Sequence, residues 1–245
     1  MSDKKSDKKI VDKKEQKKDW KPIIIYVCIQ ATSIFGTILA IAILAAIKMS
    51  QTEDFDPETF SASSEALTLG SLIPIICMAI CAVIFIAMYR KRLVEDFRRL
   101  TKKQWGLLIL AAIAVLGANM GISILLESMG VEMSNQDALA DSMTALLIPT
   151  AIMTTLMAPL VEELVFRYSL GSVIKNPIVF VVVSTIIFAA LHAMNAAIVV
   201  YLVLGLAFSL AYIKTDRNVV ASIFLHFANN LIGTIGLVLL ALGIE

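Results

Sequence analysis

Five ionisable side chains lie inside long apolar runs in the second half of the chain. They are two adjacent acids, an arginine and the chain's two histidines: Glu162, Glu163, Arg167, His192 and His226. An ionisable group at bilayer depth costs roughly 2.5 to 3.5 kcal/mol even on the gentler insertion scales, so such residues usually serve a function. Carboxylate and imidazole groups are also the side chains that most often transfer protons in catalysis. The residue types therefore predict a reaction centre inside a membrane.

The spacing of the acids and the arginine indicates different roles for the two acids. Glu163 and Arg167 are four residues apart, which places them on one helix face with the acid on the favourable N-terminal side. Glu162 points about 100° away from this pair. We expect Arg167 to hold Glu163 as an ion pair, while Glu162 stays available for proton transfer.

Two more pairs have the same four-residue spacing, namely Phe188 with His192 and His226 with Asn230. A single histidine on an apolar face is more often a packed core residue than a catalyst. Two histidines in separate apolar runs, together with an acid pair in a third, favour a shared site.

Sequence distance gives a check on this site. Asn176 and Pro177 mark a turn, and Glu162 and His192 each lie 15 residues from Pro177. An antiparallel hairpin would return both side chains to the same depth, about 22 Å from the turn. Pro159 lacks an N–H, so it is expected to kink the helix and to free the carbonyl of Thr155.

Composition and run lengths predict a helical membrane protein. Hydrophobic residues make up 58% of the 245 residues and charged residues 17%, and the mean hydropathy is +0.83. Runs of about 20 apolar residues cross hydrocarbon as helices. The expected spans are residues 23–47, 69–89, 105–126, 143–170, 178–194, 196–213 and 219–243, the last being long enough for two shorter helices around Gly233 and Gly236. The predicted fold is all-α, a polytopic transmembrane bundle of seven to eight spans.

Charge in the loops predicts the orientation. Residues 1–22 carry nine lysines and residues 90–104 carry seven basic residues, whereas residues 51–68 and 127–142 carry acids and no Lys or Arg. The positive-inside rule places the N-terminus in the cytoplasm of a multi-pass protein of the cell membrane. We expect residues 1–21 to be a disordered lysine-rich tail, residues 22–142 to form three transmembrane helices, and residues 143–245 to form the catalytic helical core.

The motifs resemble a known family. Glu162-Glu163-x-x-x-Arg167, then Phe188-x-x-x-His192, then His226-x-x-x-Asn230 are similar, in this order, to the three motifs of the CPBP family. That family comprises the CAAX prenyl proteases of the second type and the bacteriocin-processing or self-immunity proteins, also called Abi proteins. The similarity covers about residues 143–240, and all three motifs together are far more specific than any one of them.

The resemblance implies an intramembrane endopeptidase acting on a membrane-associated peptide or protein. Glu162 would act as general base on a water molecule, and His192 would help to activate that water. His226 and Asn230 would stabilise the tetrahedral oxyanion, a role that oriented donors in a dry site perform well. Glu163, Arg167 and Phe188 would then support the site.

A metal-dependent version stays open at this stage. Glu162, His192 and His226 form a His-His-Glu set, which is a known ligand set for catalytic zinc with one position left for water. The glutamate mechanism, by contrast, requires no cofactor. Other intramembrane protease classes are excluded, because the sequence has no His-Glu-x-x-His or Gly-x-Ser-x-Gly motif and the expected spans contain no Asp.

Two functions from other classes compete with the protease. One is a non-catalytic membrane scaffold or bacteriocin-immunity protein, which would bind a peptide without cutting it. The other is a proton-coupled transporter, because buried Glu, His and Arg mark ion pathways, although no second half of the sequence echoes the first. The expected partners are a peptide or membrane-protein substrate and the lipid bilayer, with no nucleic acid.

Overall fold

The computed structural model describes residues 17–52, 54–61, 63–131 and 134–241, so most of the predicted disordered tail lies outside the described residues. In chain order the elements are α1 (Lys21–Gln51), α2 (Pro57–Ser61), α3 (Ser64–Arg99), α4 (Lys102–Ser128), α5 (Ser134–Ile152), the π-helical η1 (Met153–Met157), α6 (Ala158–Glu163), the π-helical η2 (Leu164–Ser169), α7 (Leu170–Val173), α8 (Pro177–Ala190), α9 (Ile198–Lys214) and α10 (Val219–Ala241). All regular elements in these ranges are helical, which confirms the predicted fold class.

The described helices are apolar enough for a membrane bundle. Five helical stretches reach spanning length, namely α1, α3, α4, the stretch Ala145–Val173 and most of α10, while α8 and α9 are apolar but shorter. The prediction of seven or eight spans thus corresponds to seven apolar helical stretches in the described ranges. The last of them is one continuous helix rather than two around Gly233 and Gly236.

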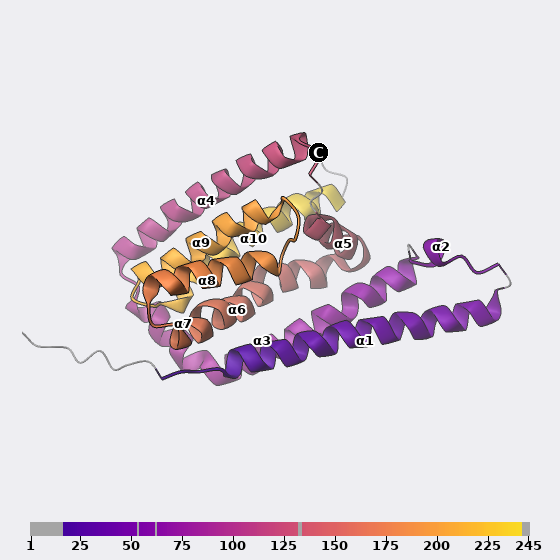
Figure 1. Cartoon of the computed structure of the whole chain (residues 1–245), viewed down its shortest axis with the longest axis horizontal. Coiled ribbons are helices and arrows are strands. Elements are labelled where there is room, and N and C mark those ends of the chain that lie inside the picture. The colour runs from indigo at the N-terminus through magenta and orange to yellow at the C-terminus, as the bar shows by residue number, and fades with distance from the viewer. Residues whose placement is uncertain (1–16, 53, 62, 132–133, 242–245) are drawn as a thin grey trace, which may run out of the picture.

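The helices form two parts (Figure 1). Helices α4 to α10 make a bundle, while α1 and α3 run side by side and extend beyond it, with α2 near the tip of this hairpin. The 31 residues of α1 and the 36 of α3 correspond to about 46 and 54 Å of helix. Both exceed the roughly 30 Å of hydrocarbon in a bilayer, so the hairpin is too long to lie upright within it.

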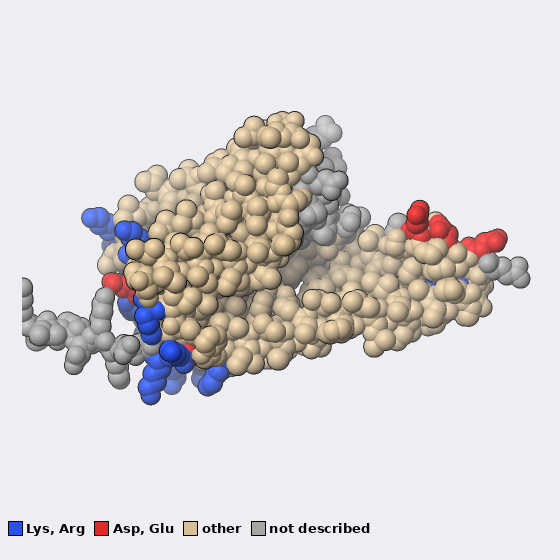
Figure 2. Space-filling view, viewed as in Figure 1, with Lys and Arg blue, Asp and Glu red and all other residues tan. Residues whose placement is uncertain are grey.

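Charged side chains gather at the two ends of the molecule (Figure 2). Acidic residues mark the tip of the α1–α3 hairpin, and lysines and arginines surround the opposite end of the bundle. The surface between them in this view carries almost no charge, as expected for the part that contacts lipid tails.

A buried aspartate at the basic end fixes the start of α10. Asp96 is fully buried and pairs with Arg92 at 3.0 Å and Arg99 at 3.3 Å. Its Oδ2 accepts the backbone N–H of Val219 at 3.0 Å, and its carbonyl accepts from Asn218 Nδ2 at 2.6 Å. Because the first N–H groups of a helix lack intrahelical partners, this carboxylate acts as a cap supplied by another helix. The depth at which α10 begins is thereby set.

Helices α8 and α9 pack closely because a glycine lies between them. A Cβ at Gly205 would come within 3.2 Å of the Thr185 backbone and within 3.3 Å of the Phe188 ring. Phe188 and Phe208 are both fully buried beside it. This contact brings the Gly205 carbonyl within reach of the polar site.

Two predicted helices differ from the structure. The helix expected over residues 178–194 ends at Ala190, and residues 191–197 form a turn that reverses the chain into α9. The helix expected over residues 143–170 is broken at Leu146, where φ is −143° and ψ is 64°, and contains two π-helical segments. At neither break does the sequence contain the Gly or Pro that usually marks the end of a helix.

Candidate active site

The two acids lie at the end of α6, a helix of six residues between two π-helical segments. Pro159 is at the start of α6, where its missing N–H is tolerated. Glu162 is 8% exposed and Glu163 is fully buried. Single π-helical turns often occur at functional sites because they change the direction of the side chains that follow.

The π turn also decides which carbonyl is freed before the acids. In η1 the Ala158 N–H bonds to the Met153 carbonyl, five residues back. In this register, the N–H that Pro159 lacks would have bonded to Thr154. The prediction that Thr155 is freed was therefore wrong by one residue, and Asn230 Nδ2 donates to the Thr154 carbonyl at 3.0 Å.

Glu163 and Arg167 form an ion pair that is completely buried. Arg167 Nη1 lies 3.1 Å from Glu163 Oε1, and neither side chain is exposed. Arg167 Nη2 donates to the Gly205 carbonyl at 3.1 Å. Its guanidinium lies 4.7 Å from the Phe188 ring centre and 5.4 Å from that of Phe208. The cation is thus stabilised by one carboxylate, one carbonyl and two aromatic faces.

His226 is held by the Glu163 carboxylate and by two aromatic rings. Its Nδ1 lies 2.9 Å from Glu163 Oε1. Its ring stacks on Phe208 at 4.7 Å and meets Phe188 edge-on at 5.7 Å. Because Glu163 is bound to Arg167 and accepts hydrogen bonds, the Nδ1 of His226 carries a proton and its Nε2 points to the other acid.

His192 lies in the turn after α8 rather than within the helix. Its Nδ1 is 2.7 Å from the Phe188 carbonyl, which only accepts, so this nitrogen also carries a proton. The ring stacks on Tyr201 at 4.9 Å and lies 4.3 Å from Phe188. These contacts fix the orientation of the His192 ring although the residue lies in a turn and not in a helix.

The free faces of Glu162, His192 and His226 converge. Glu162 Oε2 is 3.6 Å from His192 Nε2 and 4.0 Å from His226 Nε2, and this oxygen has no hydrogen-bond partner in the described part of the chain. With both Nδ1 atoms protonated and engaged elsewhere, the two Nε2 atoms and Glu162 Oε2 face one another as three hydrogen-bond acceptors when both imidazoles are neutral. One water bridges two acceptors at such spacings with hydrogen bonds of about 2.8 Å. The arrangement is suited to bind and polarise a water molecule.

The same atoms bear on the zinc alternative. Each imidazole keeps its Nδ1 on a carbonyl or carboxylate, which is how metal-binding histidines are usually oriented. Within the residues described, however, no group of three His, Cys, Asp or Glu side chains is close enough to hold a metal ion. The ligand types fit zinc, but the spacing of the three side chains does not.

Asn230 forms no hydrogen bond with Glu162, His192 or His226 among the described contacts. Its partners are Asn229 and the Thr154 carbonyl. Besides its bond to Thr154, it accepts from Asn229 Nδ2 at 3.2 Å, and Asn229 accepts from Asn119 Nδ2 at 2.9 Å. The three amides form a chain from α4 through α10 to η1. Because the Thr154 carbonyl only accepts, it sets the direction of every amide in this chain.

Sequence reasoning missed several residues that shape the site: Asn119, Asn229, Thr154, Tyr201, Gly205 and Phe208. Asn119 carried a usable signal, since it is an amide in an otherwise apolar run. The others look like ordinary residues of apolar helices. The structure gathers six of the predicted residues around one centre, Asn230 lies beside η1, and their catalytic roles stay predictions.

The fold and site define a polytopic helical membrane protein with a buried glutamate–histidine centre. Residues 144–232, which contain all seven predicted site residues, match the family model "Type II CAAX prenyl endopeptidase Rce1-like". A curated relative, the "Putative membrane peptidase YdiL" of Bacillus subtilis (strain 168), is 27% identical over 225 residues, covering 88% of this chain and 87% of the relative. No solved structure matches the chain. These matches support the predicted resemblance to the CPBP family, and the family model covers the part of the chain that carries the site.

Proposed function

We propose that this protein is an intramembrane endopeptidase that hydrolyses a membrane-associated peptide or protein by a glutamate mechanism. The observation that carries the proposal is the convergence of Glu162 Oε2 with two imidazole Nε2 atoms, at 3.6 and 4.0 Å. The family match supports the reaction class and does not favour the scaffold or the transporter.

In this mechanism Glu162 accepts a proton from the bound water as the oxygen attacks the peptide carbonyl. His192 orients the water through Nε2, and the negative charge moves to the carbonyl oxygen. When the C–N bond breaks, Glu162 returns its proton to the leaving amine, so that protons balance over the cycle. The products are a new carboxylate and a new amine.

The oxyanion is stabilised by His226 and Asn230. His226 donates from Nε2 only as an imidazolium, so it must take up a second proton from solvent before the water attacks, and it keeps that proton through the cycle. In this state its Nδ1–H still donates a hydrogen bond to Glu163 Oε1 at 2.9 Å. Asn230 uses one amide hydrogen on the Thr154 carbonyl and has a second one to give. Donors fixed before the reaction stabilise the developing charge without reorganisation.

Location and orientation follow from the charge distribution. We place the protein in the cell membrane with its basic end in the cytoplasm, as the positive-inside rule requires and as the separation of charges in Figure 2 supports. The N-terminal segment before α1 lies at this basic end, since Asp19 bonds to Ser169 and Ser172 of η2 and α7. The substrate would reach the site from that side or laterally from lipid.

The proposal is tested by comparing membrane peptides and small secreted peptides in cells that carry the wild-type protein or the Glu162→Gln variant. We expect one precursor to accumulate in the variant, and its processed form to show the cleaved bond. Equal peptide profiles at equal protein levels would contradict the protease and support a scaffold.

Metal removal separates the two mechanisms. Zinc, if held by Glu162, His192 and His226, would polarise the water and the carbonyl as a Lewis acid. The glutamate mechanism predicts that protein stripped with a strong chelator and dialysed keeps its full rate of cleavage. Loss of activity that Zn²⁺ restores would instead assign the centre to a metalloprotease, and the metal content of both samples provides the control.

The amide chain gives a further prediction. Asn119→Leu removes the donor to Asn229, which frees the amides to rotate and misorients Asn230. We expect kcat to fall about fivefold, the value of one hydrogen bond, with KM unchanged. Asn119→Gln, which keeps the donor, should recover part of the loss, and Met120→Leu at the exposed neighbour should have no effect. An unchanged kcat in Asn119→Leu would show that the chain only aids packing.

A further inference from the structure

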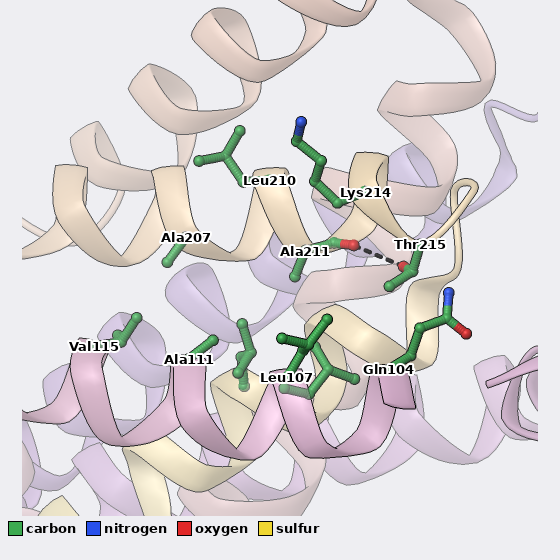
Figure 3. A pocket seen from close by; sticks show the side chains of 11 residues that line it. Gln104, Leu107, Ala111, Val115, Ala207, Leu210, Ala211, Lys214 and Thr215 are labelled. Carbon is green, nitrogen blue, oxygen red and sulfur yellow. Dashed lines mark hydrogen bonds between the residues drawn. The ribbon is translucent and has the colours of Figure 1, made fainter. Parts of the chain in front are cut away.

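An apolar groove lies between α4 and α9 (Figure 3). These helices are on the side of the bundle away from α1 and α3 (Figure 1). Its volume is about 320 Å³, within the range of small-molecule pockets. Residues of α4 and α9 form most of its lining, including Gln104, Ala111 and Val115 on α4 and Ala207, Ala211 and Lys214 on α9. None of them belongs to the glutamate–histidine centre.

The groove exists because small side chains face one another across the two helices. Ala207 and Ala211 are four residues apart on α9, and Ala111 lies opposite on α4 (Figure 3). Larger side chains form the two edges of the groove: Leu107 on α4 is 56% exposed and Leu210 on α9 is 40% exposed. The groove is thus an open channel on a lipid-facing surface rather than an enclosed core cavity.

The length of the groove matches one lipid tail in one leaflet. From Gln104 to Val115 the lining covers 11 residue steps of α4, which is about 16 Å. Half of the hydrocarbon core of a bilayer is about 15 Å. An acyl chain that starts at the polar end of the groove would therefore extend along it to the middle of the membrane.

The polar end of the groove is basic. Lys214 of α9 and Gln104 of α4 lie toward the same end of the groove but on opposite sides of it in Figure 3, and Lys214 is exposed. The lining contains no Asp or Glu, and the end of α9 lies on the side of the bundle where Lys and Arg gather. Basic pockets between membrane helices on this side attract anionic headgroups.

We propose that this groove is a binding site for an anionic phospholipid, with one acyl chain between α4 and α9 and the headgroup phosphate near Lys214. The charge at the rim selects the lipid headgroup, and the alanines make room for the chain. The proposal does not depend on the protease reaction, because no residue of the groove takes part in it.

The test measures retained lipid by native mass spectrometry of the full-length protein in mild detergent. The probes are phosphatidylglycerol and phosphatidylcholine with identical acyl chains, and glycerol phosphate as a headgroup without a chain. We expect the wild type to retain one phosphatidylglycerol at least fivefold more than phosphatidylcholine, and to retain no glycerol phosphate. Binding of glycerol phosphate at the same level would overturn the lipid assignment in favour of a simple anion site.

Two variants locate the lipid. Lys214→Gln should reduce retention of phosphatidylglycerol about fivefold, the effect of one basic residue near an anionic headgroup, whereas Lys91→Gln, at an exposed lysine of α3, should not. Ala211→Phe should fill the groove and abolish retention, with Ala207→Leu as a second variant if the larger ring impairs folding. Equal retention of both lipids by the wild type, or retention unchanged in Lys214→Gln and in the filled variants, would overturn the proposal.

Discussion

Replacing Glu162 with glutamine should lower the cleavage rate of the natural substrate by about 10² to 10⁴-fold, the usual contribution of a general base. The amide has nearly the shape of the carboxylate, so it fits the same space among His192, His226 and the helix ends. It has no capacity to accept the proton of the water. The loss should therefore appear in kcat, measured on purified protein in detergent or vesicles, with little change in KM.

A double variant tests whether the converging atoms act as a unit. If Glu162 and His192 share one water, Glu162→Gln combined with His192→Gln should be hardly slower than Glu162→Gln alone, because residues that act together are non-additive. Glu127→Gln, at an exposed acid near the end of α4, is the matched control and should keep full activity. Independent, multiplying losses would argue that His192 acts elsewhere than on that water.

Replacing Arg167 with methionine should destabilise the fold by about 3 to 5 kcal/mol, because it leaves the Glu163 carboxylate buried without its cation. Both side chains are completely buried, so solvent does not screen the loss. Phe188 and Phe208 would also lose their contacts with the guanidinium. The measurement is the unfolding midpoint in mild detergent, together with the amount of protein in the membrane.

The compensating variant separates charge from packing. Glu163→Gln together with Arg167→Met removes both charges and still offers His226 an amide oxygen, so it should recover much of the lost stability. Lys48→Met provides a control, since the Lys48–Glu65 pair has the same 3.1 Å separation but both side chains are about half exposed. Its removal should scarcely move the midpoint. A double variant as unstable as Arg167→Met would show that the arginine acts through its packing alone.

Much of the helix arrangement could be predicted from the sequence, because apolar runs of spanning length have few alternatives in a membrane. The equal distance of Glu162 and His192 from Pro177 also predicted their meeting, and the structure places them 3.6 Å apart. The four-residue spacing predicted the contact between Glu163 and Arg167 for the same reason, since it depends on local geometry.

What escaped prediction depends on contacts between distant helices. His192 was expected within a helix and lies in a turn, where its Nδ1 bonds to the Phe188 carbonyl. The bond between Asn229 and Asn119 joins residues 110 positions apart, and nothing in either local sequence specifies the other. The groove between α4 and α9 likewise depends on which faces of two apolar helices meet.

The π-helical segment η1 makes the length of this part of the chain as important as its residue types. Each residue advances a helix by about 100°, and η1 holds one residue more per turn than an α-helix would. Deleting a single residue between Met153 and Met157 would let the segment revert to α geometry. The acids would then swing away from both imidazoles while every side chain of the motif was still present. Sequence drift in this stretch should therefore tolerate substitutions far better than gaps, and a relative with a shortened stretch should have lost its catalytic centre.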